Sequence, residues 1–163
     1  MAFTVEDGTG LTNSNSYASV AQLDDYASIR NEDLSSYTQA QKEGALVVAS
    51  LDYVDGYFTF KGEKLNDDQA MSLPTDQVDI DAKIVSAVCA AAVLQLKGRL
   101  FVDPTEISQR IVAAESSSVG SLSESITYDG GAQYVDKYPT SQIDRLLLPY
   151  TEAQAGIGFS LRG

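Results

Sequence analysis

The sequence predicts a mainly α-helical protein: a small bundle of three or four helices with a β-hairpin and extended N- and C-terminal arms. The bundle is supported by segments that place apolar residues at helical spacing behind a residue suited to cap a helix. A later segment alternates apolar and polar residues, as a strand with one buried face does. Both ends are rich in small, turn-forming residues, which favours extended arms.

The length of 163 residues fits one domain, since domains commonly hold about 100–200 residues. We expect that domain to span residues 1–150, with a helical core at about 19–100, a hairpin at about 107–128 and a short helix at about 141–148. Residues 151–163 form the predicted C-terminal arm.

The first predicted helix follows an irregular arm at residues 1–16, which is rich in Gly, Thr, Ser and Asn. Ser19 is suited to cap a helix over Val20–Arg30, because a serine hydroxyl accepts hydrogen bonds from the first turn. The expected apolar face of this helix consists of Leu23, Tyr26, Ala27 and Ile29.

The second predicted helix begins with a capping-box pattern, Thr38 followed three residues later by Gln41. It covers about Gln39–Asp55, and Gly56 is placed to end it. Its expected apolar face consists of Ala40, Gly44, Val47, Leu51 and Val54.

A linking region separates the second helix from the next one. The aromatic stretch at Tyr57–Gly62 fits either a short strand or an extended connection. Asn66 or Asp67 is suited to cap a brief turn that runs through Met71 and stops near Pro74.

The strongest helical pattern runs to about Lys97 from a cap at Asp79 or Asp81, and Gly98 closes it. Its small side chains favour close packing against a neighbouring helix, and Cys89 is expected to be a core residue. The apolar face consists of Ile80, Ile84, Ala87, Val88, Ala91 and Leu94.

The last third of the chain is predicted to change character. Asp103–Glu106 is typical of a short capped turn, and the alternation of Leu122–Tyr128 predicts a hairpin strand with its turn near 118–121. Thr140 or Ser141 then caps a short helix over Gln142–Leu148. The tail beyond it carries Ile157, Phe159 and Leu161, which fits docking either on a partner or on the chain's own domain.

Composition removes several classes of chemistry. The chain has no His and one Cys, which excludes a Ser–His or Cys–His nucleophile, an internal disulfide and a four-thiolate zinc site. The acidic pairs and triplets, such as Asp67-Asp68, fit helix N-termini better than a calcium loop. We therefore expect no enzyme activity, no catalytic, cofactor or metal site, and no cofactor.

The N-terminus lacks the basic and apolar regions of a secretory signal, and the longest apolar stretch is shorter than the roughly 20 residues that span a bilayer. A soluble protein in a reducing compartment is expected, without membrane contact.

The formal charge of −12, from 23 Asp and Glu against 11 Lys and Arg, argues against a basic groove for nucleic acid. One segment interleaves aromatic and basic residues in the way that single-strand binding needs. Acidic neighbours surround that segment, which consists of Tyr57, Phe58, Phe60, Lys61 and Lys64.

Six ordered motifs carry a resemblance that covers the chain to about Tyr150. They are Val5–Leu11 with Asn15–Val20, Leu51–Asp55 with the aromatic stretch and Gly62, Asp68–Pro74, the alanine-rich helix, Val119–Tyr128, and Tyr138–Leu147. In this order the chain resembles the head–tail connector (adaptor, head-completion) proteins of tailed bacteriophages, a family often labelled DnaT-like single-stranded-DNA-binding proteins.

The resemblance implies a structural subunit of a dodecameric ring that joins the portal to the neck or tail. Packaged double-stranded DNA would pass through the ring without specific binding, and an acidic subunit suits such a conduit because it repels phosphate. The implied partners are further copies of the chain, the portal protein and a neck or tail-terminator protein. The implied location is the virion neck, after assembly in the host cytoplasm.

The same resemblance assigns portal docking to the C-terminal arm, through Ile157, Phe159, Leu161 and Arg162. The alternative function is that of a single-stranded-DNA-binding accessory protein of replication.

Overall fold

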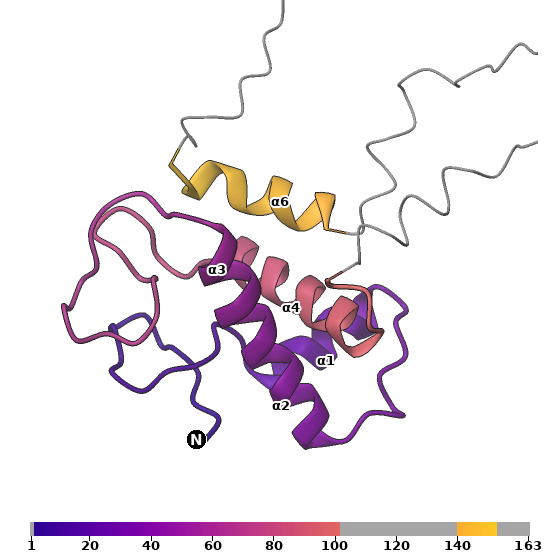
Figure 1. Ribbon diagram of the computed structural model, residues 1–163. Helices are drawn as coiled ribbons and strands as arrows, with labels where there is room; N and C mark the ends of the chain where they lie inside the picture. Colours follow the sequence, from indigo (N-terminus) through magenta and orange to yellow (C-terminus); the bar gives the residue numbers. More distant parts are fainter. Residues whose placement is uncertain (1, 102–139, 153–163) are drawn as a thin grey trace, which may run out of the picture.

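The computed structural model describes residues 2–101 and 140–152 of the chain (Figure 1). Four main helices form the bundle: α1 (Val20–Ile29), α2 (Gln39–Val47), α4 (Ala82–Leu96) and α6 (Ser141–Leu147). Helix α4 contacts the other three, so it forms the centre of the bundle. Helix α6 lies across the top in Figure 1, the N-terminal segment and the loop between α3 and α4 lie at the left, and the loop between α1 and α2 lies at the right.

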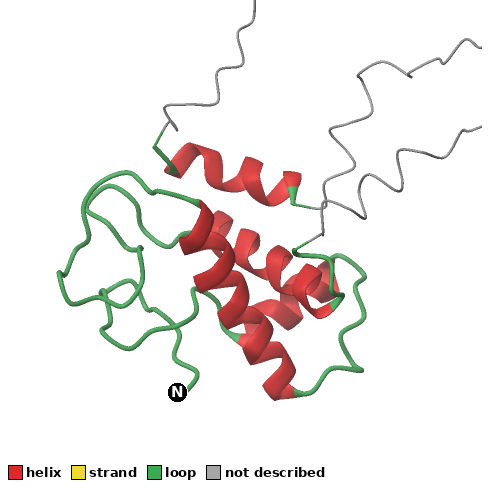
Figure 2. Ribbon diagram, in the orientation of Figure 1, coloured by secondary structure: helices red, strands yellow, loops and turns green. Residues whose placement is uncertain are grey.

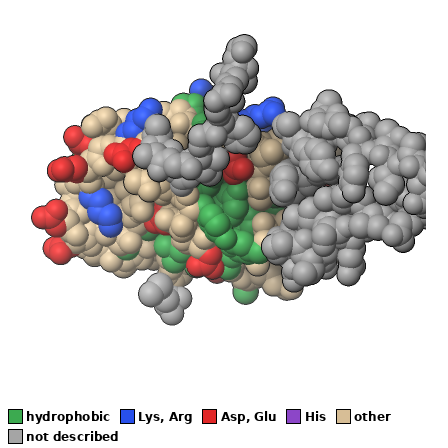
Figure 3. All heavy atoms as spheres, turned by 45° about the horizontal axis from the view of Figure 1, so that its top comes forward, with side chains coloured by type: hydrophobic (Ala, Val, Ile, Leu, Met, Phe, Trp, Pro, Cys, Tyr) green, Lys and Arg blue, Asp and Glu red, His purple; other side chains and the backbone are tan. Residues whose placement is uncertain are grey.

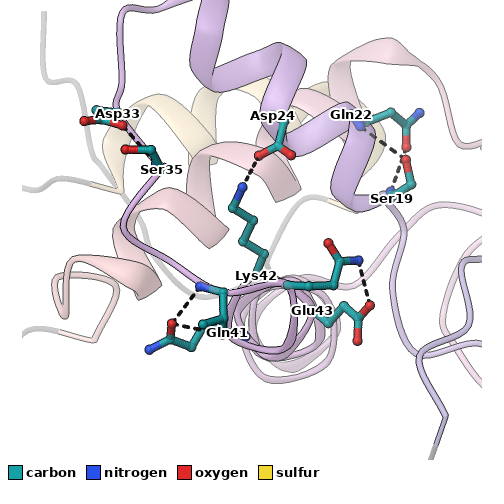
Figure 4. Close-up of polar contacts among 10 residues, drawn as sticks. Ser19, Gln22, Asp24, Asp33, Ser35, Gln41, Lys42 and Glu43 are labelled. Carbon is teal, nitrogen blue, oxygen red and sulfur yellow. Dashed lines mark hydrogen bonds and ion pairs between the residues drawn. The ribbon is translucent and has the colours of Figure 1, made fainter.

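Helix α1 begins as the sequence predicts. The Gln22 backbone N–H donates to Ser19 Oγ at 3.2 Å, and Gln22 Oε1 accepts the Ser19 backbone N–H at 2.8 Å, which completes a capping box (Figure 4). Leu23 and Ala27 are buried as expected. The placement of Ile29 on the apolar face is wrong, because its side chain is 83% exposed. Two positions beyond Ala27, at about 100° per residue, Ile29 falls on the opposite side of the helix.

Helix α2 has the predicted start and continues into two further helical segments. Thr38 and Gln41 form the predicted capping box. The chain then passes into a π-helix, η1 (Val48–Val54), and a final turn, α3 (Asp55–Tyr57). Gly56 therefore lies inside the helical stretch and does not end it.

The predicted apolar face of the second helix is largely wrong. Ala40 and Gly44 are exposed, and Val47 and Leu51 are only partly buried. The error begins within α2 itself, a regular α-helix that buries Ala45 and Leu46, the positions that directly follow the predicted Gly44. Of the predicted face only Val54 is buried. The side chains buried on α2 and η1 are Ala45, Leu46, Ala49, Ser50, Tyr53 and Val54.

Helix α4 confirms the strongest sequence pattern. Asp81 Oδ1 accepts the backbone N–H groups of Lys83 and Ile84 at 2.9 and 3.0 Å, and Gly98 follows the helix with a φ of 65°. Cys89 is buried, and burial raises the pKa of its thiol to about 12, so it stays protonated in the core. Ile80 and Leu94 are only partly buried at the edge of the core. The buried side chains of the helix are Ile84, Ala87, Val88, Cys89, Ala91, Ala92 and Val93.

Helix α6 packs on α4 through buried Ile143 and Leu147 and leads into a 3₁₀ turn, η2 (Leu148–Tyr150). Thr140 stands at its N-cap without a side-chain capping hydrogen bond. The chain beyond η2 runs antiparallel to the aromatic stretch through a single bridge between Phe60 and Thr151. That stretch is therefore an extended connection and not a strand.

The turn after it agrees with the sequence. Asn66 Oδ1 accepts the Asp68 backbone N–H at 3.1 Å, and the segment ends at the cis peptide bond between Leu73 and Pro74.

Three predictions fall outside the described residues: the hairpin at about 107–128, the turn at Asp103–Glu106, and the docking arm with Ile157, Phe159, Leu161 and Arg162. Within residues 2–101 and 140–152 there are helices and loops but no strand (Figure 2). No helix in this part of the chain has the length and apolar character needed to cross a membrane.

Candidate functional site

Four aromatic rings meet on one side of the bundle and form the candidate site. This aromatic cluster consists of Tyr53, Tyr57, Phe58 and Phe101. The ring centroid of Tyr53 lies 5.5 Å from that of Tyr57, 5.9 Å from that of Phe58 and 6.2 Å from that of Phe101. These separations are those of favourable aromatic pairs, so the cluster is a packed unit.

Two rings of the cluster face solvent. Tyr57 is 60% exposed and Phe101 is 48% exposed, and their centroids are 6.3 Å apart with an angle of 33° between the ring planes. Figure 3 shows hydrophobic side chains gathered into a patch on one face of the molecule, with acidic side chains at its edges. Large exposed rings next to each other are typical of contact surfaces.

Tyr53 is the buried ring against which the other rings of the cluster pack. Helix η1 buries its ring, and its hydroxyl donates to Asp144 Oδ1 of α6 at 2.7 Å. Burial raises the pKa of Tyr53, so the hydroxyl remains a donor. Because π-helical turns often occur at functional sites, the position of η1 directly before Tyr57 agrees with a binding role for the cluster.

The structure separates the residues that the sequence grouped for nucleic-acid binding. Phe60 is buried in the core, and Lys64 donates to the backbone oxygen of Gln69 at 3.3 Å. Lys61 donates to the Pro149 carbonyl at 2.8 Å. Tyr57 is exposed and Phe58 is half-buried, so only these two of the five grouped residues offer an aromatic ring at the surface.

Sequence reasoning missed two members of the cluster. Tyr53 belongs to a helical pattern, which indicates core packing, and Phe101 lies far from Tyr57 along the chain. No local pattern joins them, because only the packing of η1 beside the end of α4 brings these rings together.

Two lysines are paired with carboxylates. Lys42 Nζ lies 2.6 Å from Asp24 Oδ1, and Lys97 pairs with Glu32 (Figure 4 shows the former pair). These ammonium groups are already neutralised in part, which leaves less positive charge for phosphate.

The N-terminal motif has a structural role. Glu6 is buried, and its carboxylate accepts the backbone N–H groups of Gly8, Gly10 and Leu11 and the hydroxyl of Ser14, at distances of 2.6 to 3.2 Å. The arm that the sequence predicted to be irregular is therefore a folded loop organised around one carboxylate.

A second polar network joins the other motifs. The buried Tyr17 hydroxyl donates to Asp55 Oδ1 and accepts the Leu73 backbone N–H at 3.0 Å. Asp55 Oδ2 accepts the Ser72 backbone N–H at 3.0 Å, and burial raises the pKa of this carboxyl. Three motifs of the resemblance thus converge on one network that holds the loop before α4 against the helices.

Gly10 and Gln69 join the N-terminal loop to the same loop before α4. Gly10 has a φ of 78°, which side chains rarely adopt, and an added Cβ would lie only 2.9 Å from Gln69 Oε1. Both the backbone conformation and the lack of space therefore disfavour any other residue at this position. Gln69 Nε2 donates to the carbonyls of Met71 and Pro74 at 2.8 and 3.0 Å.

Neither the acidic side chains nor the surface groove of the described residues adds a catalytic or metal site. Within the described residues, no three His, Cys, Asp or Glu side chains lie together as a metal site would require. A shallow, mostly apolar groove of about 350 Å³ runs between α2 and the end of α4. Its lining is Tyr37, Gln41, Gly44, Ala45, Val48, Gln95 and Leu96.

Fold and site together define a small helical-bundle protein with an exposed aromatic contact surface. Residues 1–162 match the family described as "Putative DnaT-like ssDNA binding protein", and the chain belongs to that family. This match confirms the family label that the ordered motifs indicated. No curated protein and no solved structure matches the chain.

Proposed function

We propose that this protein is a binding protein without catalytic activity, and that its ligand is single-stranded DNA. The observation that carries the proposal is the pair of exposed rings, Tyr57 and Phe101, held side by side on the buried Tyr53. The description of its family names the same kind of ligand. In this proposal each exposed ring stacks one base.

Stacking of bases on the two exposed rings is the expected source of the affinity for DNA. One base stacked on an aromatic side chain contributes about 1–3 kcal/mol, so two rings supply about 2–6 kcal/mol. This range is the affinity lost when both rings are truncated, about 30-fold or more. A chain with a net charge of −12 adds little attraction for phosphate. One copy is therefore expected to bind weakly, and several copies along one strand would bind more tightly.

The test is a titration of fluorescent oligothymidine with the full chain at about 50 mM salt, where phosphate contacts are strongest. Wild-type protein should bind, and the double variant Tyr57→Ala, Phe101→Ala should bind at least about 30-fold more weakly. Ile29→Ala is the control, because Ile29 is another exposed large apolar side chain and lies outside the cluster. Circular dichroism must show all three proteins folded. Absence of binding by wild-type protein, or equal binding by the double variant, contradicts the proposal.

A second candidate is the head–tail connector ring subunit that the resemblance implied. The observations that favour it are the net charge of −12 and the exposed apolar side chains, which include Leu148 at 62% exposure in η2. Exposed apolar surface suits contacts between protein chains, and an acidic wall lets DNA slide. Its partners would be further copies of the chain, the portal and a neck or tail protein in the virion.

The connector candidate has its own test. Electron microscopy and co-sedimentation with the portal should show a ring, and deletion of residues 157–163 should weaken docking while the fold stays intact. That segment holds Ile157, Phe159, Leu161 and Arg162, the predicted docking residues. A protein that stays monomeric with the portal present, or that docks equally well after the deletion, would rule this candidate out.

A further inference from the structure

We propose that the aromatic cluster also binds an arginine-bearing segment of a protein partner. The guanidinium groups of that segment would lie over the exposed rings of Tyr57 and Phe101 and pair with the carboxylates of Asp52 and Asp144. This inference goes beyond the proposed function, because the interaction needs no DNA. A segment bound there would cover the two rings, so the partner and DNA would exclude each other.

The first support is the charge beside the rings. Asp144 Oδ1 accepts the Tyr53 hydroxyl at 2.7 Å, and the two oxygens of a carboxylate together have room for further donors. Asp52 directly precedes Tyr53 in η1 and is exposed. Figure 3 shows acidic side chains at the edges of the hydrophobic patch. Carboxylates in this position attract cationic side chains and repel phosphate.

In the described part of the chain, two arginines lie close to the cluster along the sequence. Arg145 is exposed, and at about 100° per residue it falls on the side of α6 opposite buried Ile143 and Leu147. It therefore points away from the bundle. Arg99 is exposed two residues before Phe101. Two carboxylates against this one guanidinium leave the surroundings of the rings negative.

The second support is the geometry of the rings. A guanidinium group is attracted to the face of an aromatic ring within about 6 Å of its centroid. The bundle itself contains such a contact, in which Arg30 Cζ lies 3.7 Å from the centroid of the Tyr26 ring. In an extended segment, residues two apart lie on one face, about 6.6 Å from each other. The Tyr57 and Phe101 centroids are 6.3 Å apart, so two arginines separated by one residue fit both rings.

Arginine suits this surface better than lysine. Its planar guanidinium group stacks on a ring and can also pair with a carboxylate through two N–H groups, whereas lysine presents a compact ammonium group. The proposed interaction should therefore discriminate between the two side chains, which an attraction based on net charge alone would not do.

The probe is the blocked peptide Gly-Arg-Gly-Arg-Gly, titrated into the isotope-labelled full chain at about 50 mM salt and followed by NMR. The amide signals of the cluster should shift, and the lysine counterpart of the peptide should bind several-fold more weakly. Tyr57→Ala and Asp52→Asn should each weaken binding about two- to fivefold. Asp68→Asn is the matched control, because it removes the same charge from an exposed position outside the cluster.

Three results would overturn the proposal: no binding of the arginine peptide, equal binding of the lysine peptide, or equal weakening by Asp68→Asn and Asp52→Asn. Cluster signals that change with protein concentration alone would assign the rings to a second copy of the chain and would also overturn it. Circular dichroism must show each variant folded.

A parallel titration with oligothymidine separates this proposal from DNA binding. Asp52→Asn should weaken binding of the peptide but not of DNA, because phosphate is repelled by the carboxylate that attracts arginine. Peptide binding without DNA binding would support this inference and contradict the proposed function. DNA binding without peptide binding would do the reverse.

Discussion

At the residue scale, Tyr17 connects three motifs that lie far apart in the sequence. Its hydroxyl links Asp55, at the end of the second helical stretch, to the backbone of Leu73. Every buried side-chain polar atom within the described residues has a hydrogen-bond partner, so removal of this hydroxyl leaves groups without their partners.

We predict that Tyr17→Phe lowers the free energy of unfolding by about 1–3 kcal/mol, the cost of leaving a buried polar group unsatisfied. Urea denaturation measures the change. Tyr57→Phe is the control, because it removes a hydroxyl from an exposed ring and should change stability by less than about 0.5 kcal/mol. Equal effects of the two substitutions would show that the network contributes nothing to stability.

Asp55 adds a prediction about pH. Burial raises its pKa in the folded protein above the ordinary value of 3.8, so the folded state binds this proton more tightly than the unfolded state. The contribution of Asp55 to stability is therefore greatest at low pH and is lost as pH rises through the raised pKa.

Asp55→Asn tests this sign, because an amide does not titrate. The stability difference between wild type and Asp55→Asn, measured by urea denaturation at several pH values, should move against wild type as pH rises above 3.8. Part of the stability difference between wild type and Asp55→Asn does not change with pH. It comes from the hydrogen bond that the Ser72 backbone N–H donates to Asp55 Oδ2, because an amide nitrogen in that place cannot accept it. A difference that is flat with pH would mean that the carboxyl has its ordinary pKa.

At the element scale, the starts of helices were easier to predict from sequence than helix faces. The caps at Ser19, Thr38 and Asp81 are local interactions between neighbouring residues, and all three form. The apolar face of the second helix was misassigned because α2 carries small or apolar residues on more than one side, and only packing against its neighbours buries Ala45 and Leu46 while Ala40 and Gly44 stay exposed. The same limit hid the aromatic cluster, whose members Tyr53 and Phe101 meet only through packing.

Helix α4 allows a test of the close packing that its small residues predicted. Ala91 is fully buried, so Ala91→Leu should overpack the bundle and lower the free energy of unfolding by about 1–3 kcal/mol. Ala82→Leu is the control, since Ala82 is exposed on the first turn of the same helix. Thermal unfolding compares the two variants, and an unchanged Tm for Ala91→Leu would contradict the packing described for α4.

At the scale of the whole molecule, the net charge and the exposed aromatic rings have opposite effects on the binding of DNA. A net charge of −12 disfavours any ligand held by phosphate contacts, whereas the exposed rings of Tyr57 and Phe101 offer stacking that needs no positive charge. Binding carried by stacking should depend only weakly on salt, because few counterions are released. A steep salt dependence would instead indicate basic contacts.

The affinity of the full chain for single-stranded oligothymidine at about 50 mM salt, compared with that of Tyr57→Ala, Phe101→Ala, tests the central claim most directly. Loss of about 2 kcal/mol or more of stacking corresponds to an affinity at least about 30-fold weaker in the double variant. We predict that loss, with Ile29→Ala unchanged. An undetectable affinity of the wild-type protein, or a double variant that binds as well as wild type, would contradict the account.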